Sequence, residues 1–291
     1  MAGNTTVTYD PKQKFEVKTQ DLEYRKAGDQ SWLATIYQPQ GAGPFPAILD
    51  VHGGAWNRGQ RSNNAVMNQA LAGSGIVVAA IDFRLAPDHP YPAQIQDVNY
   101  GTRWLKAHAK DFNADPQSVG GLGSSSGGHT VMMSALRPQD PRYTALPLPE
   151  GEGLDANLTY LLCCWPVLDP YARYLYAQES GRERLVASSE AYFLNVETMQ
   201  EGSAQHTLER GEKVQLPPAL IIQGTSDDNV PMSIPENFVA AYQKAGGTIE
   251  IEVFPDMVHG FANTPGPASD RAIERMKGFV ARQLSGSKAA V

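Results

Sequence analysis

The sequence has few cysteines and no long apolar run. Its two cysteines, Cys163 and Cys164, are adjacent, so they cannot join distant segments of the chain. No CxxC or HExxH motif is present, and no run of about eighteen apolar residues indicates a membrane span. The first fifteen residues lack the basic start and apolar stretch of a secretory signal. We therefore expect buried free thiols, no bound metal, and a cytoplasmic protein without a membrane partner.

Positive charge is also in short supply. The chain has 24 Lys and Arg against 31 Asp and Glu, which gives a net charge of −7. This balance argues against nucleic acid or an anionic membrane as a partner. Hydrophobic residues make up 42% of the chain and charged residues 19%, as is typical of a globular protein with a substantial core. We expect residues 1–291 to form a single domain.

Short apolar runs bounded by glycine and proline alternate with segments of helical periodicity. This alternation is typical of an α/β fold with a mostly parallel, doubly wound sheet, which binds ligands beyond the carboxyl ends of its strands. Residues 1–13 are interpreted as a polar lead-in. The expected strands span 14–24, 32–37, 47–51, 76–81, 118–122, 158–164, 218–224 and 248–254. The expected helices span 65–73, 93–110, 126–136, 233–246 and 268–284.

Residues 165–215 interrupt the alternation. Asp169 followed by Pro170 is a good start for a helix, because Asp caps the first amides and proline suits the first helical position. The segment is rich in aromatic residues, most of which we expect to pack it onto the rest of the protein. We predict a helical insertion that covers the carboxyl edge of the sheet.

The strongest chemical signal is the peptide 123–127, which reads G-x-S-x-G with Ser125 at its centre. Its glycines permit a tight turn between a strand and a helix that exposes the serine hydroxyl. A serine is a weak nucleophile until a neighbouring base activates it, so the motif alone does not establish catalysis. The rest of the chain must supply a base, a carboxylate and donors for an oxyanion.

His259 is the best candidate for the base. It follows the last expected strand, in a loop at the carboxyl edge of the sheet, and so is placed to reach Ser125. His206 lies in a polar part of the insertion and is interpreted as a surface residue. His129 is close to Ser125 in sequence, but on a helix its side chain would point away, so we expect it to be a packing residue.

The carboxylate is expected just after the strand that ends at Gly224. Asp227 and Asp228 are both available there. Adjacent loop residues usually point apart, so only one of them can reach His259. We favour Asp227, which is nearer the strand, and keep Asp228 and then Asp256 as the alternatives.

The oxyanion donors are expected from the amide of Ser126 and from the loop 52–56 after the strand 47–51. The small residues of that loop let the backbone approach a substrate closely. His52 is predicted to hold the loop. Trp56, Trp165 and Val258 are predicted pocket residues, although Trp56 could instead fill the core.

Taken together, these segments resemble the esterases of the α/β-hydrolase superfamily that are similar to hormone-sensitive lipase. The resemblance implies a Ser125–Asp227–His259 triad, no cofactor, and hydrolysis of a small-molecule ester through an acyl-enzyme. By the same analogy, Gly54 and Ala55 supply the loop donors of the oxyanion hole, with Gly53 as a spacer. The matching pieces, in chain order, are His52-Gly53-Gly54, Asp82-Phe83-Arg84-Leu85-Ala86-Pro87, Gly123 to Gly128, Asp227 with Val230-Pro231, and His259-Gly260-Phe261.

Two departures from the pattern concern the substrate. Ala55 stands where a third glycine is usual, and this version of the loop also resembles the arylformamidases. The run Gly127-Gly128-His129 resembles acetyl and feruloyl esterases. A small acyl or aromatic ester is the expected substrate, with an amide or formamide as the first alternative. A binding protein of this fold that no longer catalyses is the second. The resemblance is compatible with a monomer or a homodimer.

Overall fold

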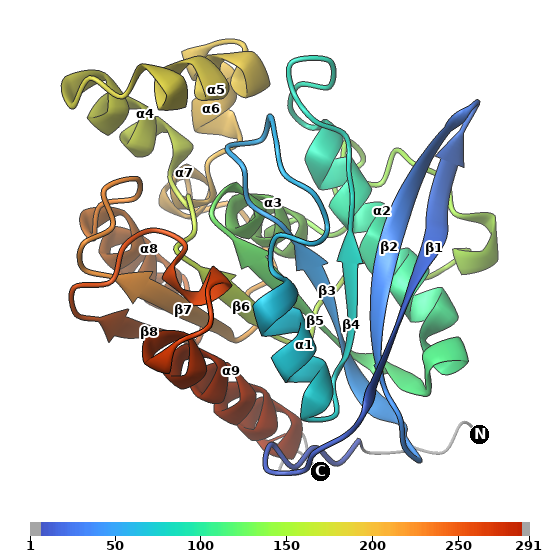
Figure 1. Ribbon diagram of the computed structural model, residues 1–291. Helices are drawn as coiled ribbons and strands as arrows, with labels where there is room; N and C mark the ends of the chain where they lie inside the picture. The colour runs from blue at the N-terminus through green and yellow to red at the C-terminus, as the bar shows by residue number, and fades with distance from the viewer. Residues whose placement is uncertain (1–6, 287–291) are drawn as a thin grey trace.

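The computed structural model describes residues 7–286 and is built around one eight-stranded sheet (Figure 1). The strand order is β1-β2-β4-β3-β5-β6-β7-β8. β1 pairs antiparallel with β2 and β2 antiparallel with β4, whereas all the later pairs are parallel. The predicted α/β class, with a mostly parallel sheet flanked by helices, is therefore confirmed.

Every predicted strand is present, although several boundaries differ. β5 begins at Ala114 instead of Ser118, and β6 begins at Leu161 instead of Leu158. The strands are β1 (Val17–Ala27), β2 (Gln30–Pro39), β3 (Phe45–Val51), β4 (Val77–Ile81), β5 (Ala114–Ser124), β6 (Leu161–Cys164), β7 (Ala219–Gly224) and β8 (Ile249–Phe254).

Helices cover both faces of the sheet (Figure 1). α1 and α9 pack on one face, and α2, α3 and α8 pack on the other. The bounds are α1 (Ala65–Gly73), α2 (Ala93–His108), α3 (Ser126–Leu136), α8 (Ser233–Lys244) and α9 (Pro267–Gly286). The two central strands β3 and β4 are buried along their whole length, which explains why they read as continuous apolar runs.

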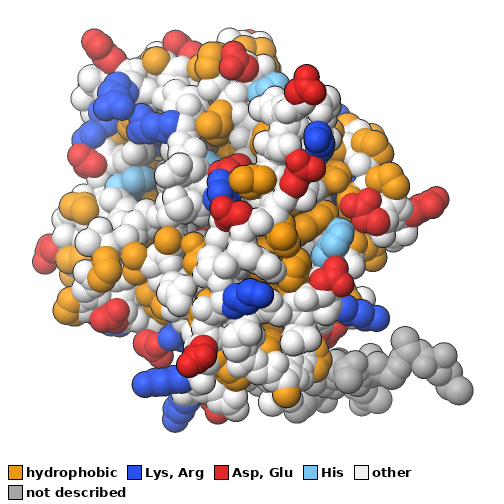
Figure 2. Space-filling model, turned by 45° about the vertical axis from the view of Figure 1, so that its right-hand side comes forward, with side chains coloured by type: hydrophobic (Ala, Val, Ile, Leu, Met, Phe, Trp, Pro, Cys, Tyr) orange, Lys and Arg blue, Asp and Glu red, His pale blue; other side chains and the backbone are white. Residues whose placement is uncertain are grey.

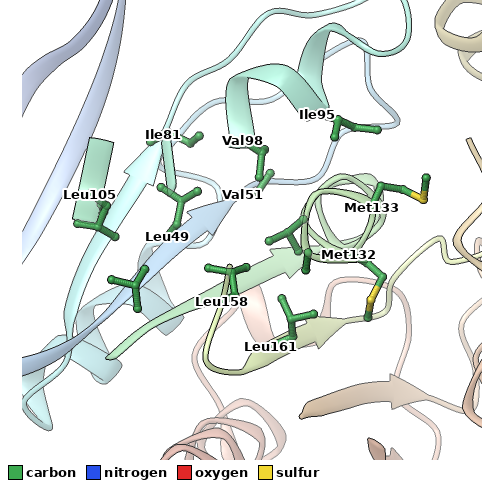
Figure 3. Packing of buried hydrophobic residues seen from close by; sticks show 14 of the residues in the cluster. Leu49, Val51, Ile81, Ile95, Val98, Leu105, Met132, Met133, Leu158 and Leu161 are labelled. Atoms are coloured by element: carbon green, nitrogen blue, oxygen red, sulfur yellow. The ribbon is translucent and has the colours of Figure 1, made fainter. Parts of the chain in front are cut away.

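The core on the α2–α3 face joins helices and strands that are far apart in the sequence (Figure 3). Leu49 and Val51 of β3 lie beside Ile95 and Val98 of α2, and Met132 of α3 completes the layer. Each of these side chains is fully buried, which stabilises the fold by about 1.5–3 kcal/mol per large apolar side chain. This packing holds α3, and hence the peptide 123–127 before it, firmly against the sheet.

Four short helices occupy the predicted insertion between β6 and β7. They are α4 (Pro170–Glu179), α5 (Glu183–Phe193), α6 (Val196–Glu201) and α7 (Ala204–Glu209). Asp169 caps α4 as predicted, since its carboxylate accepts hydrogen bonds from the amides of Tyr171 and Ala172 at 3.1 Å each. Helices α4, α5 and α6 lie beyond one end of the sheet (Figure 1).

Two local predictions were wrong. Ser233 and Glu236 form no capping box, because α8 begins after Met232, which is already helical and makes no side-chain cap. The lead-in 1–13 is not simply polar. Val7 and Tyr9 are buried, and the Tyr9 hydroxyl lies 2.8 Å from the Ser74 hydroxyl. Residues 1–6 lie outside the described part of the chain.

The surface and the cysteines are as the composition suggests. Acidic and basic side chains are interspersed with hydrophobic ones over the face in Figure 2. Between residues 7 and 286 no helix has the length and apolar character needed to cross a bilayer. Cys163 and Cys164 are buried free thiols, and burial raises the pKa of Cys163 to about 12, so the reactive thiolate is scarce at neutral pH.

The imidazole of His129 connects the insertion to the segment after β3. Trp56 donates its indole N–H to His129 Nδ1 at 3.1 Å. The other ring nitrogen, Nε2, lies 2.7 Å from the carbonyl of Gly202 and donates to it. His129 is therefore neutral and fully buried, as a packing residue should be, and burial lowers its pKa to about 4.

The glycines of β5 are required by what packs on them. A Cβ on Gly120 would lie 2.1 Å from a ring atom of Tyr160, which is itself buried. Gly120→Ala is therefore expected to lower the free energy of unfolding by about 2–3 kcal/mol, measured by urea denaturation. The control Gly73→Ala, where a Cβ meets nothing within 4 Å, is expected to be neutral or slightly stabilising. Equal effects of the two variants would contradict this explanation.

The low pKa of His129 predicts a pH dependence of stability. An unfolded histidine takes up its proton near pH 6.5 but the folded one only near 4, so the unfolded state binds more protons between these values. Stability is therefore lost as the pH falls through this window, by up to about 2–3 kcal/mol. His129→Gln should flatten this slope in urea titrations at pH 7, 6 and 5. His89→Gln, at a half-buried position, should keep the slope of the unchanged protein.

Candidate active site

Ser125 occupies the sharp turn between β5 and α3. Its backbone has φ 53° and ψ −121°, a conformation that is strained for a residue with a side chain. Two hydrogen bonds hold it there: its amide donates to the Cys164 carbonyl at 2.9 Å, and its carbonyl accepts from the Val167 amide at 3.1 Å. A Cβ on Gly127 would lie 2.1 Å from the Val51 carbonyl oxygen, so this turn requires glycine there.

Three side chains from distant parts of the sequence meet at this turn. His259, in the loop after β8, places Nε2 at 2.9 Å from the Ser125 hydroxyl. Its other ring nitrogen, Nδ1, lies 2.8 Å from Oδ2 of Asp227, in the loop after β7. The predicted residues Ser125, His259 and Asp227 thus form one hydrogen-bonded chain. An imidazole held between a carboxylate and a hydroxyl is able to take up the hydroxyl proton.

The carboxylate of Asp227 is fully engaged by its surroundings. Its Oδ1 accepts from the amides of Asn229 and Val230 at 2.9 and 2.8 Å. Its Oδ2 accepts from the Gln223 side chain at 3.0 Å in addition to His259. The side chain is only 1% exposed, and these donors fix its position. Asp227 can therefore orient the imidazole without moving.

The rival candidates lie elsewhere. Asp228 points to solvent, with 68% of its side chain exposed, and pairs with Arg182 at 3.0 Å. Asp256 is exposed in a left-handed turn, φ 62°, where its amide donates to the Thr225 hydroxyl. His206 lies 3.7 Å from Asp169 within the insertion. None of these three contacts His259 among the interactions of residues 7–286.

The loop 52–56 lies directly against the serine. A Cβ on Gly53 would lie 2.9 Å from Cβ of Ser125. The amide of Gly53 donates to the Ser124 hydroxyl at 3.0 Å, so it is not available to an oxyanion. The amides of Gly54 and Ala55 donate to no acceptor within residues 7–286, and both face the same strained loop. Ser126 begins α3, where the first amides of a helix have no helical partner.

His52 holds this loop at its base. Its Nδ1 lies 2.7 Å from the Gly53 carbonyl, and its ring stacks on Phe83 with 4.2 Å between the ring centroids. Burial lowers the pKa of His52, so the ring is uncharged at neutral pH. These contacts are those of a supporting residue.

A buried polar network behind the loop was not predicted. Asp50 of β3 accepts from the side-chain amides of Asn64 and Asn68 at 2.7 and 2.6 Å. Asn64 in turn accepts from the Ser124 hydroxyl at 3.0 Å, and Ser124 accepts from Gly53. Burial raises the pKa of Asp50 to about 6. The only signal in the sequence is an acidic residue inside the apolar run 47–51.

A small cavity of about 190 Å³ opens over the Ser125 hydroxyl. Trp165 lines it as predicted. Trp56 and Val258 do not: the Trp56 ring is 1% exposed and stacks on Tyr192 at 5.4 Å, and Val258 points outward with 57% exposed. The lining residues are Gly53, Gly54, Ala55, Arg58, Asn63, Ser124, Ser125, Trp165, Asn229, His259, Gly260 and Asn263.

Curated relatives share this arrangement in the sequence. The esterase LipC of Mycobacterium tuberculosis is 31% identical over 75% of this chain and 53% of its own. The carboxylesterase NlhH of the same species is 28% identical over 75% of this chain and 67% of its own. The chain thus spans about half the length of LipC and two thirds of that of NlhH.

Solved structures agree in fold. An esterase of Thermogutta terrifontis with bound propionate is 25% identical, with a TM-score of 0.71 over 92% of this chain and 94% of its own. An esterase of Pyrobaculum calidifontis is 20% identical, with a TM-score of 0.75 over 91% of this chain and 85% of its own. Residues 34–242 match the BD-FAE family. The chain therefore has the α/β-hydrolase fold and belongs to the BD-FAE family.

Proposed function

We propose that this protein is a serine carboxylic ester hydrolase. The observation that carries the proposal is the continuous chain of hydrogen bonds from Ser125 Oγ through His259 to Asp227, at 2.9 and 2.8 Å. The relatives named esterase and carboxylesterase support the same conclusion. A ligand-binding protein without catalysis would not need this geometry, which requires three separate loops to agree.

The reaction follows from the positions of these groups. Ser125 attacks the ester carbonyl while His259 Nε2 takes the hydroxyl proton, and His259 then gives this proton to the departing alcohol oxygen. Asp227 stabilises the imidazolium formed in between. The acyl-enzyme is hydrolysed when His259 removes a proton from water, which attacks the same carbonyl and restores the Ser125 hydroxyl.

The negative charge on the carbonyl oxygen needs donors already in place. The amides of Gly54, Ala55 and Ser126 are proposed for this role, because they surround Ser125 and the two loop amides have no other acceptor within residues 7–286. Gly53 is a spacer, since its amide already donates to Ser124.

The size of the cavity favours a small ester. About 190 Å³ is room for a short acyl chain or a single ring beside Trp165. The Thermogutta esterase, whose structure contains propionate, supports a short acyl group. A small acyl or aromatic ester is therefore the proposed substrate, bound beneath the helices α4–α6 of the insertion.

The role of Ser125 is tested with an organophosphonate that carries a fluorescent tag. We expect one adduct, located at Ser125 by peptide mass spectrometry, and a loss of ester hydrolysis of at least about 10³-fold in Ser125→Ala. Labelling of another serine, or full activity of the variant, would refute the proposal.

The same preparation separates an esterase from a formamidase. Methyl and nitrophenyl esters with acyl chains of two to eight carbons are compared with N-formylkynurenine at equal concentration. We expect the short esters to have the highest kcat/KM. Faster cleavage of the formamide would assign the amidase alternative to the same three residues.

The hydrogen bond from Gly53 to Ser124 predicts a positioning effect. Ser124→Ala leaves the buried amide of Gly53 without an acceptor and releases the loop that carries Gly54 and Ala55. We expect kcat to fall about tenfold with little change in KM, because the loop donors act mainly on the transition state.

A matched control comes from the helix that follows. Ser134 is also buried, and its hydroxyl has no hydrogen-bond partner among the described residues. Ser134→Ala removes the same atom without releasing any loop, so kcat should stay unchanged. A fall in kcat of the same size in both variants would mean that general loosening, and not the loop, is responsible.

A further inference from the structure

One charged residue at the cavity has no role in the reaction described above. Arg58 lines the cavity together with Ser125 and His259. Its amide donates to the Gly54 carbonyl at 3.2 Å, and its Cγ would lie 3.2 Å from a Cβ on Gly54. The guanidinium therefore begins next to the amides that face the reacting carbonyl.

Arg58 is exposed and has no acidic partner. No carboxylate of residues 7–286 lies within ion-pair distance of it, whereas most of the arginines near the sheet are paired, for example Arg61 with Asp82 at 2.6 Å and Arg84 with Asp97 at 2.9 Å. An unpaired guanidinium offers a planar set of N–H donors that match a carboxylate.

A second unpaired guanidinium lies behind the wall of the same cavity. Arg173 of α4 is 1% exposed and donates to Asn229 Oδ1 at 3.3 Å and to the Ser189 hydroxyl at 3.0 Å. It lies over the Trp56 ring at 5.1 Å, and its Nε has no partner within the described chain. Burial lowers its pKa to about 10, which still leaves it charged at neutral pH.

The cavity lining contains no acidic residue to offset these charges. The nearest carboxylate, Asp227, is buried and committed to His259 and to three N–H donors. The side-chain amides of Asn63, Asn229 and Asn263 line the same space and add neutral donors. In a protein with a net charge of −7, the mouth of this site is thus locally positive.

We propose that the preferred ester carries a carboxylate, which Arg58 binds beside the reacting carbonyl. This inference rests on the proposed ester hydrolysis and specifies its substrate class. The carboxylate belongs either to the acyl part, as in the half ester of a dicarboxylic acid, or to the alcohol part. Arg58 is then a specificity residue, and Arg173 strengthens the positive potential of the wall without touching the substrate.

The experiment compares charged esters with neutral esters of the same shape. For the acyl part these are monomethyl succinate and methyl butyrate, and for the alcohol part 4-acetoxybenzoate and phenyl acetate, with release of acid followed at constant pH. The quantity measured is the ratio of kcat/KM for the charged ester to that for the neutral one. We expect Arg58→Gln to lower this ratio about tenfold in one of the two pairs, which identifies the part that carries the charge.

Two controls exclude a general effect of charge. Arg282→Gln removes the same charge from α9, where Arg282 pairs with Glu250 at 2.7 Å on the edge strand β8. This variant should keep the ratio of the unchanged protein. Arg58→Lys should retain part of the preference, because it keeps the charge but loses the planar fork. An unchanged ratio in both pairs for Arg58→Gln would overturn the proposal.

A binding measurement separates this proposal from the proposed reaction. In Ser125→Ala, which cannot form an acyl-enzyme, binding of succinate and benzoate is measured by calorimetry with and without Arg58→Gln. We expect one of these anions to bind about tenfold more weakly when Arg58 is replaced. If no ester is hydrolysed but this difference is found, the anion site stands and the esterase proposal fails. If esters are hydrolysed and neither anion depends on Arg58, the anion site fails alone.

Discussion

Parallel pairing fixes where the strands of this sheet end, and the site depends on that constraint. The register pairs Val51 with Gly123, Ser124 with Cys164, Cys164 with Ile222, and Gly224 with Phe254. The last residues of β3, β5, β6, β7 and β8 therefore reach the same edge, and the loops that follow them meet there. Because the strands are held by buried apolar packing on both faces, the distances among the three site residues are set by the core.

The sequence was sufficient for the parts of the protein that depend on short-range patterns and on this edge rule. The apolar runs predicted every strand, and the position of each loop after a strand predicted Ser125, Asp227 and His259 together. Boundaries shifted where glycine or proline interrupts a strand, as in β5, whose Gly120 lies under the ring of Tyr160. Such a glycine reads as a weak strand former until its neighbour from another strand is known.

Other features could not be predicted, because they depend on which segments meet in three dimensions. Trp56 follows the predicted oxyanion loop in sequence, yet its ring turns away from the cavity and packs between His129 and Tyr192. The connection from Asp50 through Asn64 to Ser124 joins residues that are far apart in the chain. Nothing in the spacing of these residues indicates that they touch, and the same holds for the absence of a carboxylate near Arg58.

The backbone of the loop after β3 has a consequence of its own. Ala55 and Trp56 are consecutive residues with positive φ, at 51° and 64°, although neither is glycine. A left-handed conformation costs a residue with a side chain about 1–2 kcal/mol, so the fold holds the loop against a local tendency to relax. The packing of the Trp56 ring under the insertion supplies that restraint. The insertion therefore acts as a clamp that keeps the loop amides preorganised before any ligand arrives, and chemistry at Ser125 is coupled to the folding of helices that never touch it.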